Sequence, residues 1–303
     1  MNNDEYSSKS LAYEFLKLLN HKNNLNTIKI LCVPFPFLSI IDNMCQGAGS
    51  VFVGAQNCSP YDEGAYTGEV SAKMLKSLNI PYVIIGHSER RELFFEKSKD
   101  LILKAKVAIE NKIKPIFCCG EPLDIREKND HINFVINQLE ETIFSLDSNS
   151  FSKITIAYEP IWAIGSGKTA TNEEIQEMHS AIRKNVKKQY GSSVSKNVSI
   201  LYGGSVKSIN AKEIFDLEDV DGGLIENSVL AIGSSPDNID DITDVSDDGD
   251  DNDGNTVDDP TVIDITYVPP YFEVFNLVLS LIHISEPTRP ERIGYAVVCV
   301  KKK

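Results

Sequence analysis

The stretch that decides the fold runs from Ile154 to Ala170 and reads ITIAYEPIWAIGSGKTA. Its first residues, Ile154 to Ala157, are an apolar run typical of a short buried strand. Glu159 follows at the end of that run, and Pro160 then breaks regular structure because it fixes φ and lacks an amide N–H. The pattern TNEE, which begins at Thr171, predicts the start of a helix. A carboxylate at the carboxyl end of a strand, followed by a loop and a helix, is the layout of an active site in a parallel α/β protein.

Seven short apolar runs, each with helical patterns between it and the next, recur along the chain up to residue 225. Continuous apolar strands that alternate with helices indicate a parallel sheet covered on both faces. Near-regular spacing favours a (β/α) barrel over a doubly wound sheet, although pattern alone leaves both open. The predicted strands are 28–33, 51–55, 82–85, 116–118, 154–157, 198–202 and 222–225, and predicted helices include 72–78, 97–111, 132–144, 172–189 and 210–215.

Charge is concentrated in one segment of the 303-residue chain. Twelve Asp and no Lys or Arg lie between Asp237 and Asp264, and they account for most of the formal net charge of −14. The rest of the chain is near neutral, so its charge gives no reason to expect nucleic acid as a partner. The Asp-rich segment has low complexity and no helical period, and we interpret it as a disordered linker.

The six cysteines show no CxxC pair and no disulfide framework. Cys32, Cys118 and Cys119 lie in apolar runs, which suits small buried side chains in a reducing, cytoplasmic compartment. The N-terminus lacks the basic and apolar regions of a signal peptide. The longest apolar run, Val274 to Ile284, contains polar residues and is shorter than the about 20 residues of a membrane span. We therefore expect no membrane association.

Two side chains are candidate catalytic residues. Glu159 would serve as a general base in a pocket that excludes water, and the alternative is a capping or salt-bridged carboxylate. His87, in the run IIGHSERR, comes directly after a predicted strand and at a helix start. That position favours a neutral imidazole, which can polarise a carbonyl group. The alternative for His87 is a structural histidine with satisfied hydrogen bonds.

Three turns that follow predicted strands offer backbone amides to a phosphate group: those at Gly165, at Ser205 and after the last strand. A nucleotide-binding P-loop at GSGKT is disfavoured, because Trp162 occupies the position where that motif needs its first glycine. Asp244 to Asn255 has a partial calcium-loop spacing, but two ligand positions carry the wrong residue type. A solvated linker is favoured there over a metal site, and we expect no metal elsewhere.

Five segments together resemble the triosephosphate isomerase family: GAQNCSPYDEGAYTGE, IIGHSERR, CGEPLDIRE, AYEPIWAIGSGKTAT and LYGGSV. The resemblance covers residues 1 to about 225. It implies a (β/α)8 barrel, a homodimer, no cofactor, and interconversion of dihydroxyacetone phosphate with glyceraldehyde 3-phosphate, a step of glycolysis and gluconeogenesis.

The resemblance also implies roles for individual residues. Glu159 would move a proton between adjacent carbons and His87 would polarise the substrate oxygens, a pairing known from this family. Gly165 and Ser205 would bind the phosphate through their amides, and Thr67 would reach the partner subunit's site. The lid over the substrate would include Pro160, Ile161, Trp162, Lys168, Thr169 and Ala170.

Both ends of the resembling region depart from the family. The family's first strand carries an Asn and a catalytic Lys, and this sequence begins after the position of that Lys. At the other end, Glu226 and Asn227 follow the last strand where the resemblance implies a phosphate-binding Gly-Gly pair and a final helix. We therefore expect a barrel that lacks its first strand and last helix and is open between its end strands, and we expect its turnover to be low.

The division of the chain follows from these departures. Residues 1–225 are predicted to be an incomplete isomerase barrel, 226–270 an acidic linker and 271–303 a tail of non-native translation. The run LSLIHISEPTR (279–289) is similar to the conceptual translation of a sequencing adaptor, and the alternative is a genuine acidic extension. Three functions stay open: an isomerase, a catalytically silent barrel, and more distantly a calcium-binding or linker protein.

Overall fold

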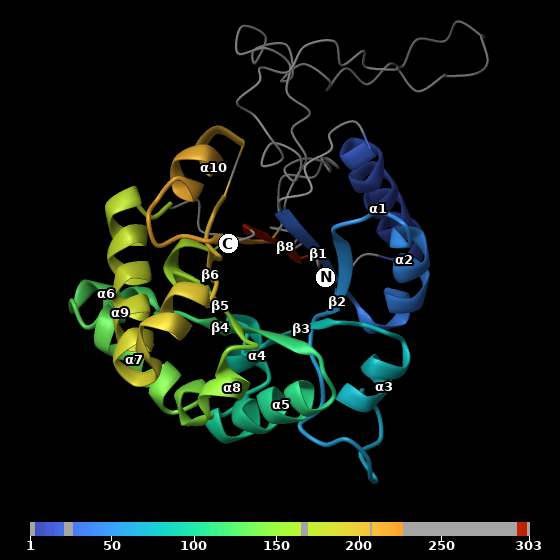
Figure 1. The fold of residues 1–303 in the computed structure, drawn as a ribbon, viewed down its shortest axis with the longest axis horizontal. Helices are drawn as coiled ribbons and strands as arrows, with labels where there is room; N and C mark the ends of the chain where they lie inside the picture. Colours follow the sequence, from blue (N-terminus) through green and yellow to red (C-terminus); the bar gives the residue numbers. More distant parts are fainter. Residues whose placement is uncertain (1–3, 21–26, 165–168, 207, 227–295, 302–303) are drawn as a thin grey trace, which may run out of the picture.

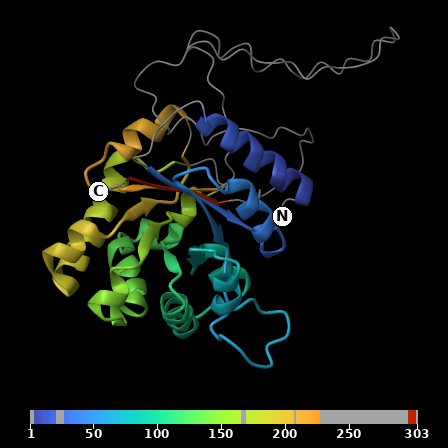
Figure 2. The same cartoon turned by 45° about the vertical axis from the view of Figure 1, so that its right-hand side comes forward.

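The computed structural model describes residues 4–20, 27–164, 169–206, 208–226 and 296–301. Its strands form a closed barrel in the order β1 to β8, with helices around the outside (Figures 1 and 2). The strands are β1 (Thr27–Val33), β2 (Val51–Ala55), β3 (Tyr82–Ile85), β4 (Lys114–Cys119), β5 (Thr155–Tyr158), β6 (Ile200–Tyr202), β7 (Gly222–Glu226) and β8 (Ala296–Lys301).

All seven predicted strands are present, and consecutive neighbours from β1 to β7 pair in parallel. This confirms the predicted α/β class and decides for a barrel over a doubly wound sheet. The boundaries differ by a few residues: the strand predicted at 116–118 begins at Lys114, and the one predicted at 198–202 begins at Ile200. Parallel pairing brings the carboxyl ends of all seven strands to one end of the barrel.

The expectation of an open barrel is wrong, because β8 lies between β1 and β7 and pairs with both. β8 runs antiparallel to its neighbours, so Ala296 pairs with Cys32 and Glu226 at one end, and Lys301 pairs with Thr27 at the other. Its sequence AVVCVK is rich in the β-branched residues that favour strands. The predicted disordered linker lies outside the described residues.

Helices separate most consecutive strands and pack against the outer face of the barrel (Figure 1). The helix predicted at 132–144 ends at Glu140 and gives way to a 3₁₀ turn. The long helix α9 breaks at Gly191, whose φ of 85° is not helical, close to the predicted end at 189. The helices are α1 (Glu5–Asn20), α2 (Leu38–Cys45), α3 (Ala72–Ser77), α4 (Ser88–Leu93), α5 (Ser98–Glu110), α6 (Leu123–Glu127), α7 (His131–Glu140), α8 (Ser148–Phe151), α9 (Asn172–Asn197) and α10 (Ser208–Phe215).

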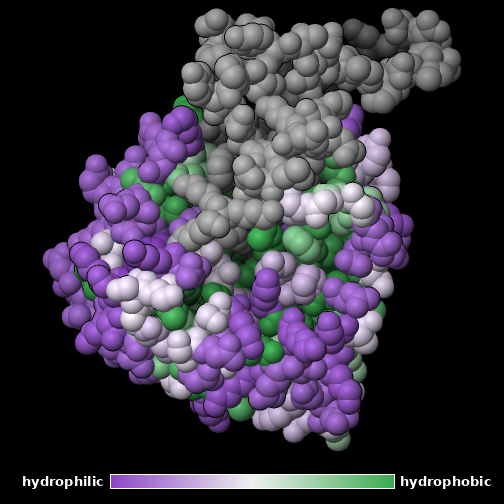
Figure 3. Space-filling view, viewed as in Figure 1, coloured by the Kyte–Doolittle hydropathy of each residue, from purple (hydrophilic) through white to green (hydrophobic). Residues whose placement is uncertain are grey.

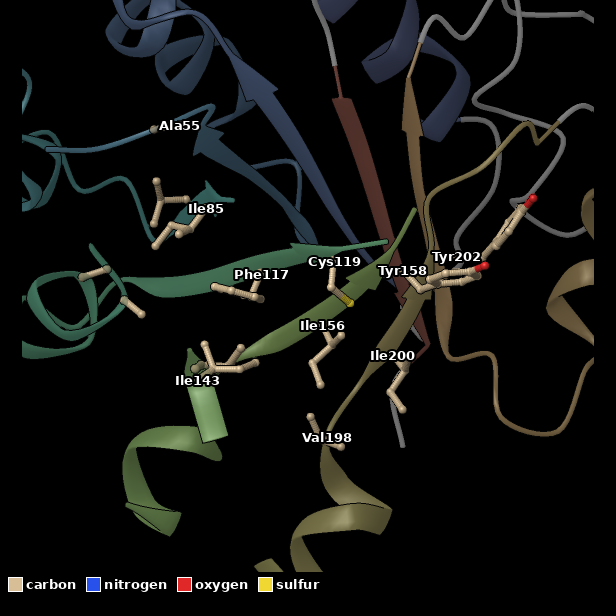
Figure 4. Packing of buried hydrophobic residues seen from close by; sticks show 14 of the residues in the cluster. Ala55, Ile85, Phe117, Cys119, Ile143, Ile156, Tyr158, Val198, Ile200 and Tyr202 are labelled. Carbon is tan, nitrogen blue, oxygen red and sulfur yellow. The ribbon is translucent and has the colours of Figure 1, made fainter. Parts of the chain in front are cut away.

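The core has two parts because successive strand residues point to opposite faces. Ile116 and Cys118 of β4 belong to the cluster inside the barrel, whereas Phe117 and Cys119 belong to the larger cluster between strands and helices. Figure 4 shows this larger cluster, with Phe117, Cys119 and Ile156 side by side. On the face drawn in Figure 3, hydrophilic side chains cover most of the helical rim.

Cys32, Cys118 and Cys119 are buried, as predicted from their apolar surroundings, and none of these three is joined in a disulfide bond. Burial raises the pKa of the Cys32 and Cys119 thiols well above the ordinary range, so both stay protonated. No helix within the described ranges is long and apolar enough to cross a bilayer.

His179 on α9 makes the stability of the fold sensitive to acid. Burial lowers its pKa from 6.5 to about 4, so the folded protein keeps the imidazole neutral while the unfolded chain protonates it. Stability from this group is therefore complete above pH 6.5 and is lost as the pH falls to about 4, by roughly 3 kcal/mol. Urea unfolding between pH 7 and pH 4 measures this loss. His179→Asn should show a flatter dependence over that window, and identical slopes for the two proteins would contradict the assignment.

Candidate active site

Glu159 and His87 meet at the carboxyl ends of the strands. Glu159 follows β5 directly, and His87 follows β3 after Gly86. The Glu159 Oε1 and His87 Nε2 atoms are 3.2 Å apart. Both side chains are buried, with 1% of Glu159 and 7% of His87 exposed. The structure thus brings together two residues that are 72 positions apart and were predicted separately from their places after strands.

The hydrogen bonds of His87 define its tautomer. His87 is the N-cap of α4, and its Nδ1 atom accepts the backbone N–H of Glu89 at 3.4 Å. An accepting Nδ1 carries no proton, so the proton of the neutral imidazole lies on Nε2. Nε2 is the atom that faces Glu159. The ring is therefore oriented with Nε2 3.2 Å from the carboxylate oxygen Oε1.

The second oxygen of Glu159 contacts the first turn of α4. The backbone N–H of Ser88 donates to Oε2 at 3.3 Å. A carboxylate near the positive end of a helix is stabilised by exposed amides of this kind. Sequence reasoning did not predict this contact, although the SER run directly after His87 marks the helix start that supplies it.

Two glycines leave room for Glu159. A Cβ atom on Gly120 would lie 1.7 Å from the Glu159 carbonyl oxygen, and one on Gly203 would lie 2.8 Å from Glu159 Cγ. The same backbones are joined by hydrogen bonds, from Glu159 N to Cys119 O at 2.7 Å and from Gly203 N to Tyr158 O at 2.7 Å. These approaches fix the carboxylate between the ends of β4 and β6.

Arg91 connects the end of β3 to β4 through two hydrogen bonds. Its Nε donates to Gly86 O at 2.7 Å and its Nη2 to Cys118 O at 2.9 Å. Burial lowers the pKa of the Arg91 guanidinium, and nearby thiols and Glu159 oppose that shift. Gly86 adopts a φ of 76°, which favours glycine, and a Cβ there would meet Arg91 Nη2 at 2.9 Å.

Glu121, at the end of β4, is a fully buried carboxyl group that sequence reasoning quoted only within a motif. Its Oε1 accepts hydrogen bonds from Tyr158 Oη at 3.1 Å and from Trp162 Nε1 at 2.9 Å, and Arg126 Nη1 lies 3.7 Å away. Burial raises the pKa of Glu121, and these donors and Arg126 offset part of the rise. The single tryptophan is thus attached to the barrel through Glu121.

The predicted lid is described at both of its ends. Pro160 is buried, and Ile161 and Trp162 are half-buried in a 3₁₀ turn, Ile161–Ala163. At the far end Thr169 is exposed and Ala170 is buried. Gly165 and Lys168, predicted for the phosphate and the lid, lie outside the described residues.

Two other predicted residues lie in loops that follow strands of the barrel. Ser205 is half-buried in the turn after β6, and its carbonyl accepts a hydrogen bond from Asn210 Nδ2 at 3.3 Å. Thr67 is exposed in the long loop between β2 and α3, which projects from the lower right of the barrel in Figure 1. Within one chain the structure does not bring Thr67 to the pair.

The pair offers a buried carboxylate beside a neutral imidazole, a combination suited to moving a proton next to a polarised carbonyl. Within the described ranges, no three His, Cys, Asp or Glu side chains gather as a metal site would require.

Comparisons with known proteins agree with this geometry. The family model described as triosephosphate isomerase matches residues 1–242. Triosephosphate isomerase of Cytophaga hutchinsonii is 45% identical over 221 residues, which are 73% of this chain and 87% of that protein. The Porphyromonas gingivalis protein of the same name is 52% identical over 180 residues, 59% of this chain and 72% of its own, and the Bacteroides fragilis protein is 45% identical over 223 residues, 74% and 87% respectively. The chain therefore belongs to the triosephosphate isomerase family.

Proposed function

We propose that this chain interconverts dihydroxyacetone phosphate and glyceraldehyde 3-phosphate. Family membership supports the reaction class. The observation that carries the proposal is the 3.2 Å contact between Glu159 Oε1 and His87 Nε2 at the carboxyl ends of β5 and β3. Active sites of (β/α) barrels lie at this end.

In the proposed mechanism, Glu159 takes a proton from the carbon next to the substrate carbonyl and returns it to the neighbouring carbon. The C–H electron pair forms the carbon–carbon double bond of an enediolate, and the negative charge develops on oxygen. A second proton moves between the two oxygens, so the step is balanced without an oxidant or a reductant. Glu159 is buried, so its carboxylate has little contact with solvent, and this favours proton abstraction from carbon.

His87 supplies the hydrogen bond to the oxygen that becomes negative. The acceptor role of Nδ1 leaves the proton on Nε2, which would donate to a bound substrate oxygen. The neutral imidazole of His87 can donate this hydrogen bond in both directions of the reaction without a change in its charge. This role requires the ring orientation that the N-cap of α4 fixes.

The phosphate is proposed to bind at the turn that holds Ser205, together with Gly165. The segment from Pro160 to Ala170 would cover the bound substrate, with Trp162 attached through Glu121.

A homodimer is proposed from the family, and exposed Thr67 would then reach the site of a second copy. Residues 1–225 would be the isomerase unit, serving glycolysis and gluconeogenesis in the cytoplasm.

A catalytically silent barrel is the second candidate, and β8 favours it. In a complete barrel of the family, the first strand would lie between the last strand and the second strand. In this chain β8 takes that place, between β7 and β1, and it runs in the opposite direction. The one Lys of β8 pairs with Thr27 at the amino end of β1, away from Glu159. β8 therefore has no lysine at the end of the barrel where Glu159 lies.

The experiment that tests the proposal is an isomerisation assay with the full chain and His87→Asn, each purified from a host deleted for its own isomerase. Asn is a good N-cap and can keep an acceptor for the Glu89 amide, but it is too short to replace the Nε2 donor. Turnover should fall by about 10² to 10³-fold while the thermal midpoint stays unchanged.

The matched control is His131→Asn, because His131 lies on α7 and contacts Glu177. Its activity should equal that of the unaltered chain. A full chain with no turnover above the host background would favour the silent barrel, and equal turnover of His87→Asn would remove His87 from the mechanism.

A further inference from the structure

The interval between β1 and β7 is filled by a strand from the other end of the chain. β8 makes six consecutive pairs with β1, from Thr27 to Cys32, and five with β7, from Gly222 to Glu226. It is the one antiparallel strand of the described barrel. In Figures 1 and 2 the red β8 lies beside the blue β1.

The two neighbours of β8 need a strand between them. β1 already pairs with β2 on its other side, and β7 with β6. Without β8, each would present a row of unpaired N–H and C=O groups at the point where the barrel should close. Such edges are templates for pairing with another strand. β8 satisfies both edges at once, which fixes its register from two sides.

The connection to β7 does not dictate which chain donates the strand. Glu226 pairs with Ala296, so the chain leaves β7 and enters β8 at the same end of the barrel. Antiparallel neighbours can be joined by as few as two residues, whereas residues 227–295 join these two. At about 3.3 Å per extended residue, a connection of this length can span far more than one barrel.

We propose that the interval between β1 and β7 is a strand-acceptor site, and that its partner in trans is the C-terminal strand of a second copy of this chain. The same main-chain hydrogen bonds and the same register form whether Ala296–Lys301 comes from its own chain or from the second copy. Exchange of an identical element between protomers adds no new interface chemistry. A high protein concentration favours exchange between two chains. A high effective concentration of the tethered strand favours pairing within one chain.

The register supplies a direct test, because Lys29 of β1 lies opposite Cys299 of β8. Directly opposite residues have Cβ atoms about 4.5 to 5.5 Å apart, close to the separation that a disulfide needs. Full-length Lys29→Cys is unfolded, refolded at about 1 µM and at about 100 µM, oxidised, and analysed on non-reducing gels. We expect an intrachain link at the lower concentration and at least a tenfold larger interchain share at the higher one.

Two controls identify the link. Lys29→Cys combined with Cys299→Ser should lose both products, and Lys29→Ser reports the effect of removing the buried Lys29 side chain, whose Nζ donates to Ser50 Oγ at 3.2 Å. If Lys29→Cys does not fold, Thr27→Cys with Lys301→Cys tests the same register at the other end. A link that is intrachain at both concentrations would overturn exchange in trans. No link at either position would overturn the strand-acceptor site itself.

Discussion

Glu159→Gln is expected to lower kcat/KM for dihydroxyacetone phosphate by about 10³-fold or more, with little change in the thermal midpoint. Glutamine has nearly the shape of glutamate and can accept the Ser88 N–H hydrogen bond that Oε2 accepts at 3.3 Å. It has no basic oxygen that could take a proton from carbon. The loss should therefore appear in kcat, because the proton transfer occurs only in the chemical step.

Two further variants separate the base from its position. Glu159→Asp keeps a carboxylate but withdraws it by about one carbon–carbon bond, and a misplacement of this size costs about 10²-fold. Glu141→Gln is the control, because the Glu141 carboxylate accepts a hydrogen bond from Ser98 and is not part of the Glu159–His87 pair. The activity of this variant should be unchanged. Equal activity of Glu159→Gln and the unaltered chain would remove Glu159 from the mechanism.

Gly120→Ala is expected to destabilise the fold by about 3 kcal/mol or more and to abolish turnover. The added Cβ would lie 1.7 Å from the Glu159 carbonyl oxygen, which is backbone and cannot rotate away. The backbone beside it is also fixed, since Gly120 N donates to Gln138 Oε1 and Gln138 Nε2 donates to Gly120 O, both at 3.0 Å. Relief of the clash must separate the ends of β4 and β5. Thermal and urea unfolding measure the effect.

Gly203→Ala is the matched comparison, because its Cβ would meet the Glu159 side chain at 2.8 Å and the nearest backbone atom only at 3.3 Å. The side chain can shift, so we expect a smaller loss of stability, about 1 to 3 kcal/mol, with a loss of turnover that follows the displaced carboxylate. A Gly120→Ala protein with unaltered stability would show that the strand ends are not as closely packed as described.

The strands and the positions of Glu159 and His87 after them could be predicted from the sequence because their signals are local. An apolar run such as Tyr82–Ile85 is buried along its whole length in a parallel sheet and can be recognised in the sequence without its pairing partners. Glu159 and His87 each follow such a run, and parallel strands bring those ends together. The closeness of Glu159 and His87 follows from this geometry, whereas closure into a barrel depends on the strand pairing that the structure shows.

The features that the sequence did not predict depend on distant backbone. The 1.7 Å approach at Gly120 exists only when the ends of β4 and β5 are side by side, and the Ser88 amide meets Glu159 only across the barrel. The strand Ala296–Lys301 is apolar enough to be suspected, but its place depends on two edges that are both far away in sequence.

The most direct test of the Glu159–His87 mechanism is to follow dihydroxyacetone phosphate in D₂O by NMR with the full chain and with Glu159→Gln. A carboxyl group that carries the abstracted proton exchanges it with solvent, so the full chain should form glyceraldehyde 3-phosphate labelled with deuterium at the carbon that receives the proton. Glu159→Gln should form neither product nor label above the buffer control. Product or label that forms at the same rate with both proteins would contradict proton transfer by Glu159.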